Sequence, residues 1–382
     1  MLLIKGAEVY APEQLGKKDI LIAGGQIEKV ADALPEYEGC QVIDGNGKIV
    51  APGIVDRHVH LTGGGGEGSF HTQAPPVQLS ALIEGGVTTV VGLLGTDGIS
   101  RSVENLVAKV KALKEEGISV YCCCGAYGYP SPTVTGSVSK DIMFVDEIIG
   151  LKLAVSDHRA PNISVEELIR LGSDVRTAGM LSGKAGIMTL HMGGDERGLE
   201  PVFEALERTS IPVKTFQPTH VGRSAKLQSD AFKLAKMGGT IDFTCGQFEK
   251  KFEELAESLR AAKAEGVPME KVTISSDGQG SWSNYDAAGN LTEMGVSSLD
   301  TVYRQIVYQV QKEGMPLEEA LSLGTSNVAK VLEIYPKKGA VCEGGDADVL
   351  IINSDMSLNT VIARGTIMMN EGKLCKKGTY EA

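Results

Sequence analysis

Short apolar runs alternate with longer amphipathic stretches through the middle of the chain, from about residue 86 to residue 280. The short runs are rich in Val, Ile, Thr and Leu, as buried strands are, while stretches such as 103–117 and 230–239 space their apolar residues as a helix does. This alternation is typical of βα units around a parallel sheet. Together with one run further upstream, the pattern predicts eight strands: 53–60, 87–95, 118–127, 150–157, 186–191, 213–220, 241–245 and 272–277.

Eight βα units in this length of chain fit a (β/α)8 TIM barrel better than a doubly wound sheet. The chain has 382 residues, which exceeds the size at which a single hydrophobic core keeps growing. We therefore expect one large domain and one smaller domain. The predicted fold class is α/β, with a catalytic TIM-barrel domain formed by residues 53–337.

The two ends of the chain have a different pattern. Residues 1–50 include ILIAGGQIEKV, in which two glycines separate two apolar segments, and residues 339–382 include ADVLIINSD and TVIARGTIMMNEGKLCKKG. These are short strand-like runs joined by Gly or Asn turns, without helical periodicity. Because neither end alone is long enough to bury a core, we expect residues 1–52 and 338–382 to form one small flanking β-sandwich domain.

The formal net charge is −12 at pH 7. Nucleic acids and anionic membranes are bound through basic surfaces, so neither is expected as a partner. The N-terminal sequence lacks the basic start and apolar run of a secretion signal, and no stretch of about 18 apolar residues is found. These features predict a soluble, cytoplasmic protein that acts on a small molecule or a peptide.

Seven cysteines are present, and Cys122, Cys123 and Cys124 are consecutive within an apolar run. No pair has the spacing of a structural zinc site, and an odd number is typical of reduced thiols. We expect the consecutive three to be small buried core residues of the third strand.

Four of the six histidines lie at the carboxyl ends of predicted strands. His58 and His60 end the first strand, His191 ends the fifth and His220 ends the sixth. Barrel enzymes carry their catalytic groups at these ends. Residues two apart in a strand project to the same face, so His58 and His60 can converge on one ion. A single strand-end histidine is often structural, but four at equivalent positions favour a metal centre.

Two further residues fit such a centre. Asp277 follows the eighth strand, where it can bind a metal and accept a proton; a helix cap or a turn is the alternative. Lys152 lies within the fourth strand, where a lone ammonium inside a barrel is costly. Two nearby cations should depress its pKa, and the neutral amine can add carbon dioxide to give a carbamate that bridges two metals. A salt bridge to Asp157 or another carboxylate is the alternative.

This set of residues resembles the ligands of the binuclear amidohydrolase superfamily, and within it the chain is similar to the isoaspartyl (β-aspartyl) dipeptidase family. The similarity runs nearly from end to end. It is carried by PGIVDRHVHLTGGGGE, VVGLLGTDGISR, GAYGYPSPTVTGS, SDHRA, PTHVGR and SSDGQGS. The superfamily implies a barrel flanked by a β-sandwich that is built from both chain ends.

The resemblance implies two divalent metal ions per chain. The first histidine pair would bind one ion and the second pair the other, with the lysine as a bridging carbamate formed from CO2 and the aspartate on the first ion. The implied ligands are His58, His60, Lys152, His191, His220 and Asp277. Zinc is the expected metal, although these ligand types also accept cobalt, manganese or nickel. Two cations would lower the pKa of a bridging water, and the resulting hydroxide would attack an amide carbonyl.

The resemblance also implies substrate-binding residues. Glu67 closes a glycine loop and would hold an α-ammonium group, while Arg159 and Arg223 would bind carboxylates through their guanidinium forks. Tyr127 would help to hold the developing oxyanion, which gives Tyr127, Glu67 and Asp277 as the expected catalytic residues. Further substrate contacts are expected at Gly65, Gly66, Thr96 and Ser281.

The resulting hypothesis is a metal-dependent hydrolase of β-aspartyl dipeptides, with a homo-oligomer, specifically an octamer, implied by the resemblance. Two alternatives stay open. A cyclic amidase of the dihydropyrimidinase or hydantoinase type would use the same metal ligands with a pocket for a ring imide. A non-catalytic scaffold derived from such a barrel is the other, although every ligand position is present. His71 and His158 match no ligand position and are interpreted as structural residues or as residues that support the ligands.

Overall fold

Eight parallel strands form the central barrel of the computed structural model, which describes residues 1–160 and 163–381. They are hydrogen-bonded in chain order from β6 to β13, and β6 meets β13 again through the Val59–Gly278 bridge and a 2.9 Å bond from His60 N to Gly278 O. The predicted barrel is thus confirmed. Its strands are β6 (Ile54–Val59), β7 (Val87–Gly92), β8 (Ser119–Gly125), β9 (Ile148–Val155), β10 (Ile187–Met192), β11 (Phe216–Thr219), β12 (Ile241–Thr244) and β13 (Val272–Ser275).

Residues 161, 162 and 382 lie outside the described part of the chain. Two of them belong to the predicted barrel range 53–337, and the third is the last residue of the range 338–382. The division of the chain at these boundaries stays a prediction.

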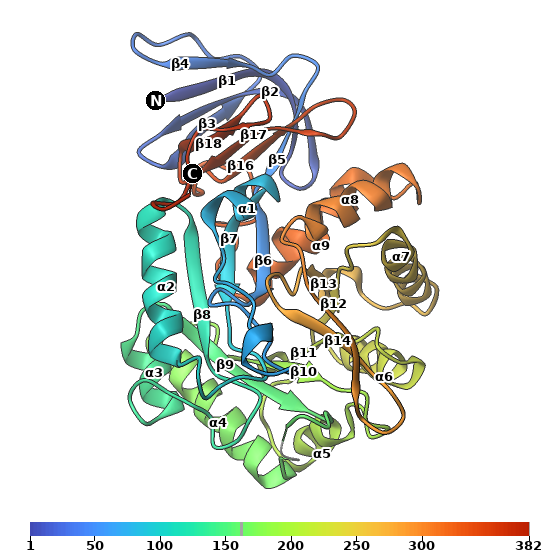
Figure 1. Cartoon of the computed structure of the whole chain (residues 1–382). Coiled ribbons are helices and arrows are strands. Elements are labelled where there is room, and N and C mark those ends of the chain that lie inside the picture. Colours follow the sequence, from blue (N-terminus) through green and yellow to red (C-terminus); the bar gives the residue numbers. More distant parts are fainter. Residues whose placement is uncertain (161–162, 382) are drawn as a thin grey trace.

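Helices surround the barrel (Figure 1). The local sequence sets their ends: Ser102 caps α2 by accepting a hydrogen bond from Asn105 N, and Gly117 ends it with a left-handed φ of 118°. Ser164 and Glu167 form a capping box at the start of α4. In the described residues, every helix is too short or too polar to cross a membrane. The helices are α1 (Leu79–Glu84), α2 (Val103–Glu116), α3 (Val138–Phe144), α4 (Val165–Ser182), α5 (Glu200–Arg208), α6 (Ala225–Lys236), α7 (Glu249–Ala264), α8 (Thr301–Gln311), α9 (Leu317–Gly324) and α10 (Ser326–Val331).

The observed barrel strands differ from the predicted ones by up to three residues at an end, and one further pair of strands was not predicted. The predicted sixth strand, 213–220, begins only at Phe216, because Pro212 starts a 3-10 turn. After the eighth strand the chain forms an unpredicted hairpin, in which β14 (Ser281–Tyr285) pairs antiparallel with β15 (Leu291–Val296). The short 3-10 helices are η1 (Phe70–Thr72), η2 (Val213–Thr215) and η3 (Met269–Lys271).

Both chain ends contribute to one nine-stranded sheet, as predicted. Figure 1 shows the blue N-terminal and red C-terminal strands together at one end of the barrel. The predicted glycine turn joins β2 to β3, and one hydrophobic cluster combines Ile4 and Ile20 with Val349 and Ile351. Neither end therefore has a core of its own. The strands are β1 (Leu2–Tyr10), β2 (Gln14–Ala23), β3 (Gln26–Ala31), β4 (Gln41–Asp44), β5 (Ile49–Pro52), β16 (Val349–Ile352), β17 (Leu358–Ala363), β18 (Thr366–Asn370) and β19 (Lys373–Leu374).

The largest hydrophobic core lies between the barrel strands and the helices, and it extends into the terminal sheet through Leu350 and Val361. The three consecutive cysteines of β8 are fully buried, which confirms their interpretation as core residues: Cys122, Cys123 and Cys124.

A buried ion pair also links the terminal sheet to the barrel. Lys338 Nζ lies 2.5 Å from Asp348 Oδ2 and 2.8 Å from Asp346 Oδ2, and it donates to Ser119 Oγ of β8 at 2.5 Å. Thr89 of β7 also donates to the carboxylate of Asp348. Because Lys338 and Asp348 are almost inaccessible to water, neither charge can be solvated if its partner is removed.

Lys338→Met should therefore lower the free energy of unfolding by roughly 3–5 kcal/mol, because it leaves Asp348 buried without its cation. Urea denaturation followed by circular dichroism measures this. Lys337→Met is the matched control: the neighbouring lysine is 66% exposed and lies 3.9 Å from Asp346, so the change should stay within about 0.5 kcal/mol. Equal stability of the two variants would contradict a structural role for the buried pair.

Candidate active site

A cavity of about 1130 Å³ opens at the carboxyl ends of the barrel strands. Segments that follow all eight strands line it, together with the hairpin β14–β15. Three of the predicted ligands lie buried behind the residues that line the cavity: His58, Lys152 and His191. The predicted site residues that line it are His60, Gly65, Glu67, Thr96, Tyr127, Arg159, His220, Arg223, Asp277 and Ser281.

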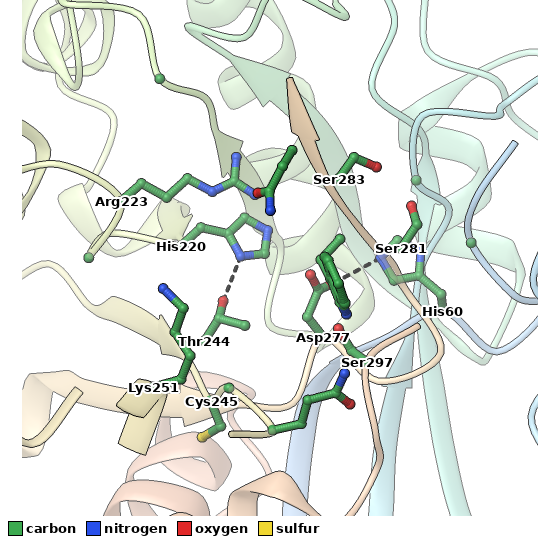
Figure 2. A pocket seen from close by; sticks show the side chains of 18 of the residues that line it. His60, His220, Arg223, Thr244, Cys245, Lys251, Asp277, Ser281, Ser283 and Ser297 are labelled. Atoms are coloured by element: carbon green, nitrogen blue, oxygen red, sulfur yellow. Dashed lines mark hydrogen bonds and ion pairs between the residues drawn. The ribbon is translucent and has the colours of Figure 1, made fainter. Parts of the chain in front are cut away.

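Three ligand-type side chains converge in this cavity. The Nε2 atoms of His58 and His60 lie 3.3 and 3.0 Å from Asp277 Oδ1, and the ligand atoms of all three residues lie within 4.8 Å of one another. A dashed line in Figure 2 marks the contact between His60 and Asp277. Asp277 has a left-handed φ of 51°, which turns the chain sharply at the end of β13. A Cβ atom at Gly280 would lie 2.7 Å from the His60 ring, so this approach requires glycine.

The other two strand-end histidines, His191 and His220, lie next to the group of His58, His60 and Asp277. The ring centroid of His220 lies 5.0 Å from that of His58 and 4.7 Å from that of His191. Both nitrogens of His191 already have partners, because Nδ1 lies 2.6 Å from the Tyr127 hydroxyl and Nε2 lies 2.8 Å from Asp157 Oδ2. The four predicted histidines thus come together, with His191 held by protein groups on both sides.

Lys152 is completely buried, and its Nζ lies 3.0 Å from His58 Nε2. Burial lowers the pKa of this amine from 10.5 to about 7, although Asp277 acts in the opposite direction. Asp157, the alternative salt-bridge partner considered for Lys152, pairs with Arg159 and His191 instead. That alternative is therefore wrong for Asp157.

The donor set fits a metal centre. Burial lowers the pKa of His58, His191 and His220 well below 6.5, and nearby cationic side chains lower it further. Neutral imidazoles keep a lone pair for a metal. The Nδ1 atoms of His58 and His60 are buried and have no hydrogen-bond partner among the described residues, so the orientation of these rings depends on what Nε2 contacts. Neutral imidazoles, a carboxylate and a buried amine are donors that a divalent ion such as zinc accepts.

Glu67 is hydrogen-bonded to two other predicted substrate contacts. Its carboxylate accepts hydrogen bonds from Thr96 Oγ1 at 3.1 Å and from Ser281 Oγ at 2.9 Å. These partners follow β7 and begin the hairpin, so residues far apart in the chain hold one carboxylate. The preceding loop depends on glycine: Gly65 has a φ of 85°, and a Cβ atom there would lie 2.4 Å from Thr72 O.

The two predicted arginines lie on the same side of the cavity but differ in exposure. Arg159 is 16% exposed; its Nη1 lies 3.7 Å from Glu67 Oε1, and its guanidinium lies 5.4 Å from the centroid of the Tyr127 ring. Arg223 is 37% exposed and donates from Nη1 to Met192 O at 2.9 Å. Burial raises the pKa of Tyr127, so this residue stays a phenol that can donate a hydrogen bond.

Sequence reasoning missed several residues that hold these groups. Arg101 donates to three backbone carbonyls in the segment 62–74 and thereby fixes the glycine loop. Its partners are 27 to 39 residues away, so no local pattern indicates the contact. Thr244 Oγ1 lies 2.5 Å from His220 Nδ1, and a dashed line in Figure 2 marks this contact. For Thr244 a signal existed, since it is a polar residue near the end of the predicted seventh strand.

The two histidines that match no ligand position lie away from the cluster of four. His71 is exposed on η1. His158 lines the cavity and packs edge-on against Tyr285 of the hairpin, with ring centroids 5.0 Å apart. Their interpretation as structural or ligand-supporting residues stays a prediction.

Comparison with known proteins supports an enzyme of the hydrolase class. The family model described as amidohydrolase family matches residues 49–368, which is most of the chain. A β-aspartyl dipeptidase from Fervidobacterium islandicum AW-1, solved in complex with β-Asp-Leu dipeptide, is 40% identical to this chain. It superposes with a TM-score of 0.93 over 100% of both chains. A second structure of a β-aspartyl dipeptidase from Fervidobacterium islandicum AW-1 has a TM-score of 0.89 and 39% identity over 100% of both chains.

Similarity to cyclic amidases is weaker or more local. Dihydroorotase of Streptococcus pyogenes serotype M3 is 39% identical over 123 residues, so the match spans 32% of this chain and only 28% of that protein. Dihydropyrimidinase from Brevibacillus agri is 16% identical and superposes with a TM-score of 0.69 over 98% of this chain and 96% of its own, which shows a shared fold. The family model, together with the full-length matches, shows that the chain belongs to the amidohydrolase family.

Proposed function

We propose that this amidohydrolase is a metal-dependent dipeptidase that hydrolyses the isopeptide bond of β-aspartyl dipeptides. The observation that carries the proposal is the pair formed by Glu67 and Arg159, whose charged ends lie 3.7 Å apart on the cavity wall. Such a pair suits a carbon atom that bears both an ammonium and a carboxylate. The full-length similarity to β-aspartyl dipeptidases supports the same substrate class.

In a β-aspartyl dipeptide the α-carbon keeps both its ammonium and its carboxylate, because the peptide bond uses the side-chain carboxyl group. We assign the ammonium to Glu67, which also accepts hydrogen bonds from two hydroxyl groups. The carboxylate on the same carbon fits Arg159 beside it, through a bidentate contact. Arg223 is more exposed than Arg159, and its ion-pair contact is with Asp157 rather than with Glu67. We assign it to the C-terminal carboxylate of the leaving residue.

The same arrangement discriminates against α-linked isomers. In an α-linked dipeptide the ammonium and the free carboxylate stand on different carbons, and the scissile carbonyl is one methylene closer to the ammonium. If the ammonium of an α-linked isomer is held at Glu67, its scissile carbonyl therefore does not reach the reacting position. A displacement of about 1 Å can cost roughly 100-fold in rate, so geometry alone is sufficient for strong discrimination.

We assign His58, His60 and Asp277 as the residues that would hold one ion, His191 and His220 as those that would hold the other, and Lys152, as a carbamate, as a ligand for both. When bound, divalent ions such as zinc would supply an activated water and polarise a carbonyl oxygen. Formation of the carbamate needs a neutral amine, and the depressed pKa of Lys152 favours that form. Carbon dioxide then adds to the nitrogen with loss of one proton.

The protein groups carry the proton and position the substrate. Asp277 accepts the proton of the attacking water as the C–O bond forms. It returns this proton to the departing amine as the C–N bond breaks. Tyr127 stays protonated and donates a hydrogen bond to the carbonyl oxygen as negative charge develops there. Glu67 and the two arginines hold the substrate so that only its carbonyl carbon reaches the reacting position.

The first prediction is that β-Asp-Leu is hydrolysed and α-Asp-Leu is not, with kcat/KM at least about 100-fold higher for the β isomer. Release of free amino acids measures hydrolysis of the two isomers, and loss of the intact ring measures hydrolysis of dihydroorotate and dihydrouracil. Glu67→Gln should lower turnover strongly, because it removes the anion that binds the ammonium, while metal content stays unchanged. Equal rates on the two isomers, or hydrolysis of only the ring imides, would overturn the assignment and favour a cyclic amidase.

The second prediction concerns metal content. The purified protein should contain two divalent ions per chain, and His58→Ala or His191→Ala should lower this number and abolish turnover, because each removes a donor. Inductively coupled plasma mass spectrometry gives the stoichiometry. His71→Ala is the matched control, since this exposed histidine is remote from the cluster. Active protein without metal would rule out the binuclear model.

The third prediction tests the carbamate. Lys152→Ala should be inactive and should regain part of its activity when short carboxylic acids such as acetate or propionate are added, because they can occupy the space of the missing carbamate. The same acids should not rescue His58→Ala. A high-resolution crystal structure that shows an unmodified Lys152 amine beside two fully occupied metals in active protein would disprove the bridging role.

A further inference from the structure

Asp157 is the most heavily used carboxylate at the site, yet it belongs to neither the proposed metal ligands nor the proposed substrate contacts. It follows β9 directly after Ser156, whose left-handed φ of 55° turns the chain there. The side chain of Asp157 is only 2% exposed, so solvent cannot stabilise its charge. Its partners are therefore all protein groups.

Two residues share this carboxylate. Oδ1 accepts hydrogen bonds from the backbone N and the Nε of Arg159, at 2.8 and 3.0 Å. Oδ2 accepts from Arg159 Nη2 at 2.9 Å and from His191 Nε2 at 2.8 Å, and Arg223 Nη1 lies 3.8 Å away. Burial opposes ionisation, but the hydrogen bonds from His191 and Arg159 outweigh it and hold the pKa of Asp157 well below its usual range. The backbone and guanidinium nitrogens of Arg159 can only donate, so Asp157 is the acceptor in each of these contacts.

The contact with Arg159 decides which part of the guanidinium faces the cavity. A guanidinium offers two bidentate edges, one formed by Nε with one Nη atom and one formed by the two Nη atoms. Asp157 occupies the Nε–Nη2 edge. The Nη1–Nη2 edge is not paired with Asp157: Nη1 lies 3.7 Å from Glu67 Oε1 and Nη2 lies 3.2 Å from His191 Nε2, while Tyr127 packs against the plane of the guanidinium. This is the edge that remains for a ligand.

The contact with His191 decides which ring nitrogen carries the proton. Nε2 of His191 also lies 3.1 Å from Arg223 Nη1 and 3.2 Å from Arg159 Nη2, but the Asp157 oxygen is the nearest of the three atoms. A 2.8 Å hydrogen bond to a carboxylate oxygen requires a proton on Nε2. With the proton on Nε2, Nδ1 keeps the lone pair, which accepts a hydrogen bond from the Tyr127 hydroxyl at 2.6 Å. Nδ1 is thus the atom that His191 can offer to a metal.

We propose that Asp157 is a positioning residue that couples the two halves of the site: it presents the open edge of Arg159 to the substrate carboxylate and selects the metal-binding tautomer of His191. This rests on the proposed function for its substrate half only. The metal half is independent of which substrate is hydrolysed.

Asp157→Asn tests both halves in the intact enzyme. Asparagine has the same shape but only one acceptor oxygen, so it cannot satisfy the Nε–Nη2 edge and Nε2–H together. We expect KM for β-Asp-Leu to rise and zinc retention against a chelator to weaken, each by about 10- to 100-fold. Asp195→Asn is the matched control: this exposed aspartate pairs with Arg197, and its variant should match the wild type in both measurements.

A double-mutant cycle separates positioning from general structural damage. Arg159→Met should raise KM by itself, and adding Asp157→Asn should raise it less than about twofold further, because the same contact is already lost. Zinc retention should still fall in the double variant, since the contact to His191 is removed only by the second change. Should Asp157→Asn fail to fold, Asp157→Glu keeps the charge but moves the oxygens, and the same rise in KM is expected.

The outcomes are distinct. Unchanged KM and unchanged zinc retention in Asp157→Asn would overturn the proposal, and so would fully additive effects on KM in the double variant. Absence of β-Asp-Leu hydrolysis by the wild type would instead overturn the proposed function. In that case, zinc retention by Asp157→Asn still decides the histidine half of the inference.

Discussion

The cost of burying charge governs the arrangement at the mouth of the barrel. Lys152, Asp157 and three of the histidines are nearly inaccessible to water, and an isolated ion in such a place costs on the order of several kcal/mol. Each group is therefore neutral or paired. Burial keeps the imidazoles neutral and brings the amine close to neutrality, while Asp157 keeps its charge through two partners. The same compensation that makes these groups tolerable also prepares them for binding a metal.

The loops that follow the strands carry the proposed substrate contacts, in addition to the buried groups at the strand ends. The glycine loop carries Glu67 and is fixed by Arg101, while the hairpin brings Ser281 to the same carboxylate. Dihydropyrimidinase from Brevibacillus agri shares the fold at only 16% identity, so the fold alone does not fix the substrate. Under the proposed function, substrate choice depends on where these loops place one anion and two cations.

Away from the site, the terminal sheet also contains buried charges that are stabilised by pairing. Strands from both chain ends share one core, and the buried pair of Lys338 and Asp348 connects that sheet to the barrel. The barrel lies between the two ends in the sequence, and the ion pair fixes their joint sheet to the barrel. This explains why short segments at opposite ends of the sequence are stable as one sheet.

Sequence alone determined the barrel, the joint sheet of the two ends, and the presence of ligand-type residues at the strand ends. These features follow from local periodicity and from the rule that parallel strands end at one face, as His58, His191 and Asp277 illustrate. The hairpin was not foreseen, because residues 281–296 have no strong alternation of apolar and polar positions. Only the tertiary structure decided that Asp157 holds Arg159 and His191 rather than Lys152, that Arg101 fixes the glycine loop, and that Arg159 lies beside Glu67. Such pairings join residues from different loops, and their partners are chosen by distance and burial in the folded chain, which no local pattern encodes.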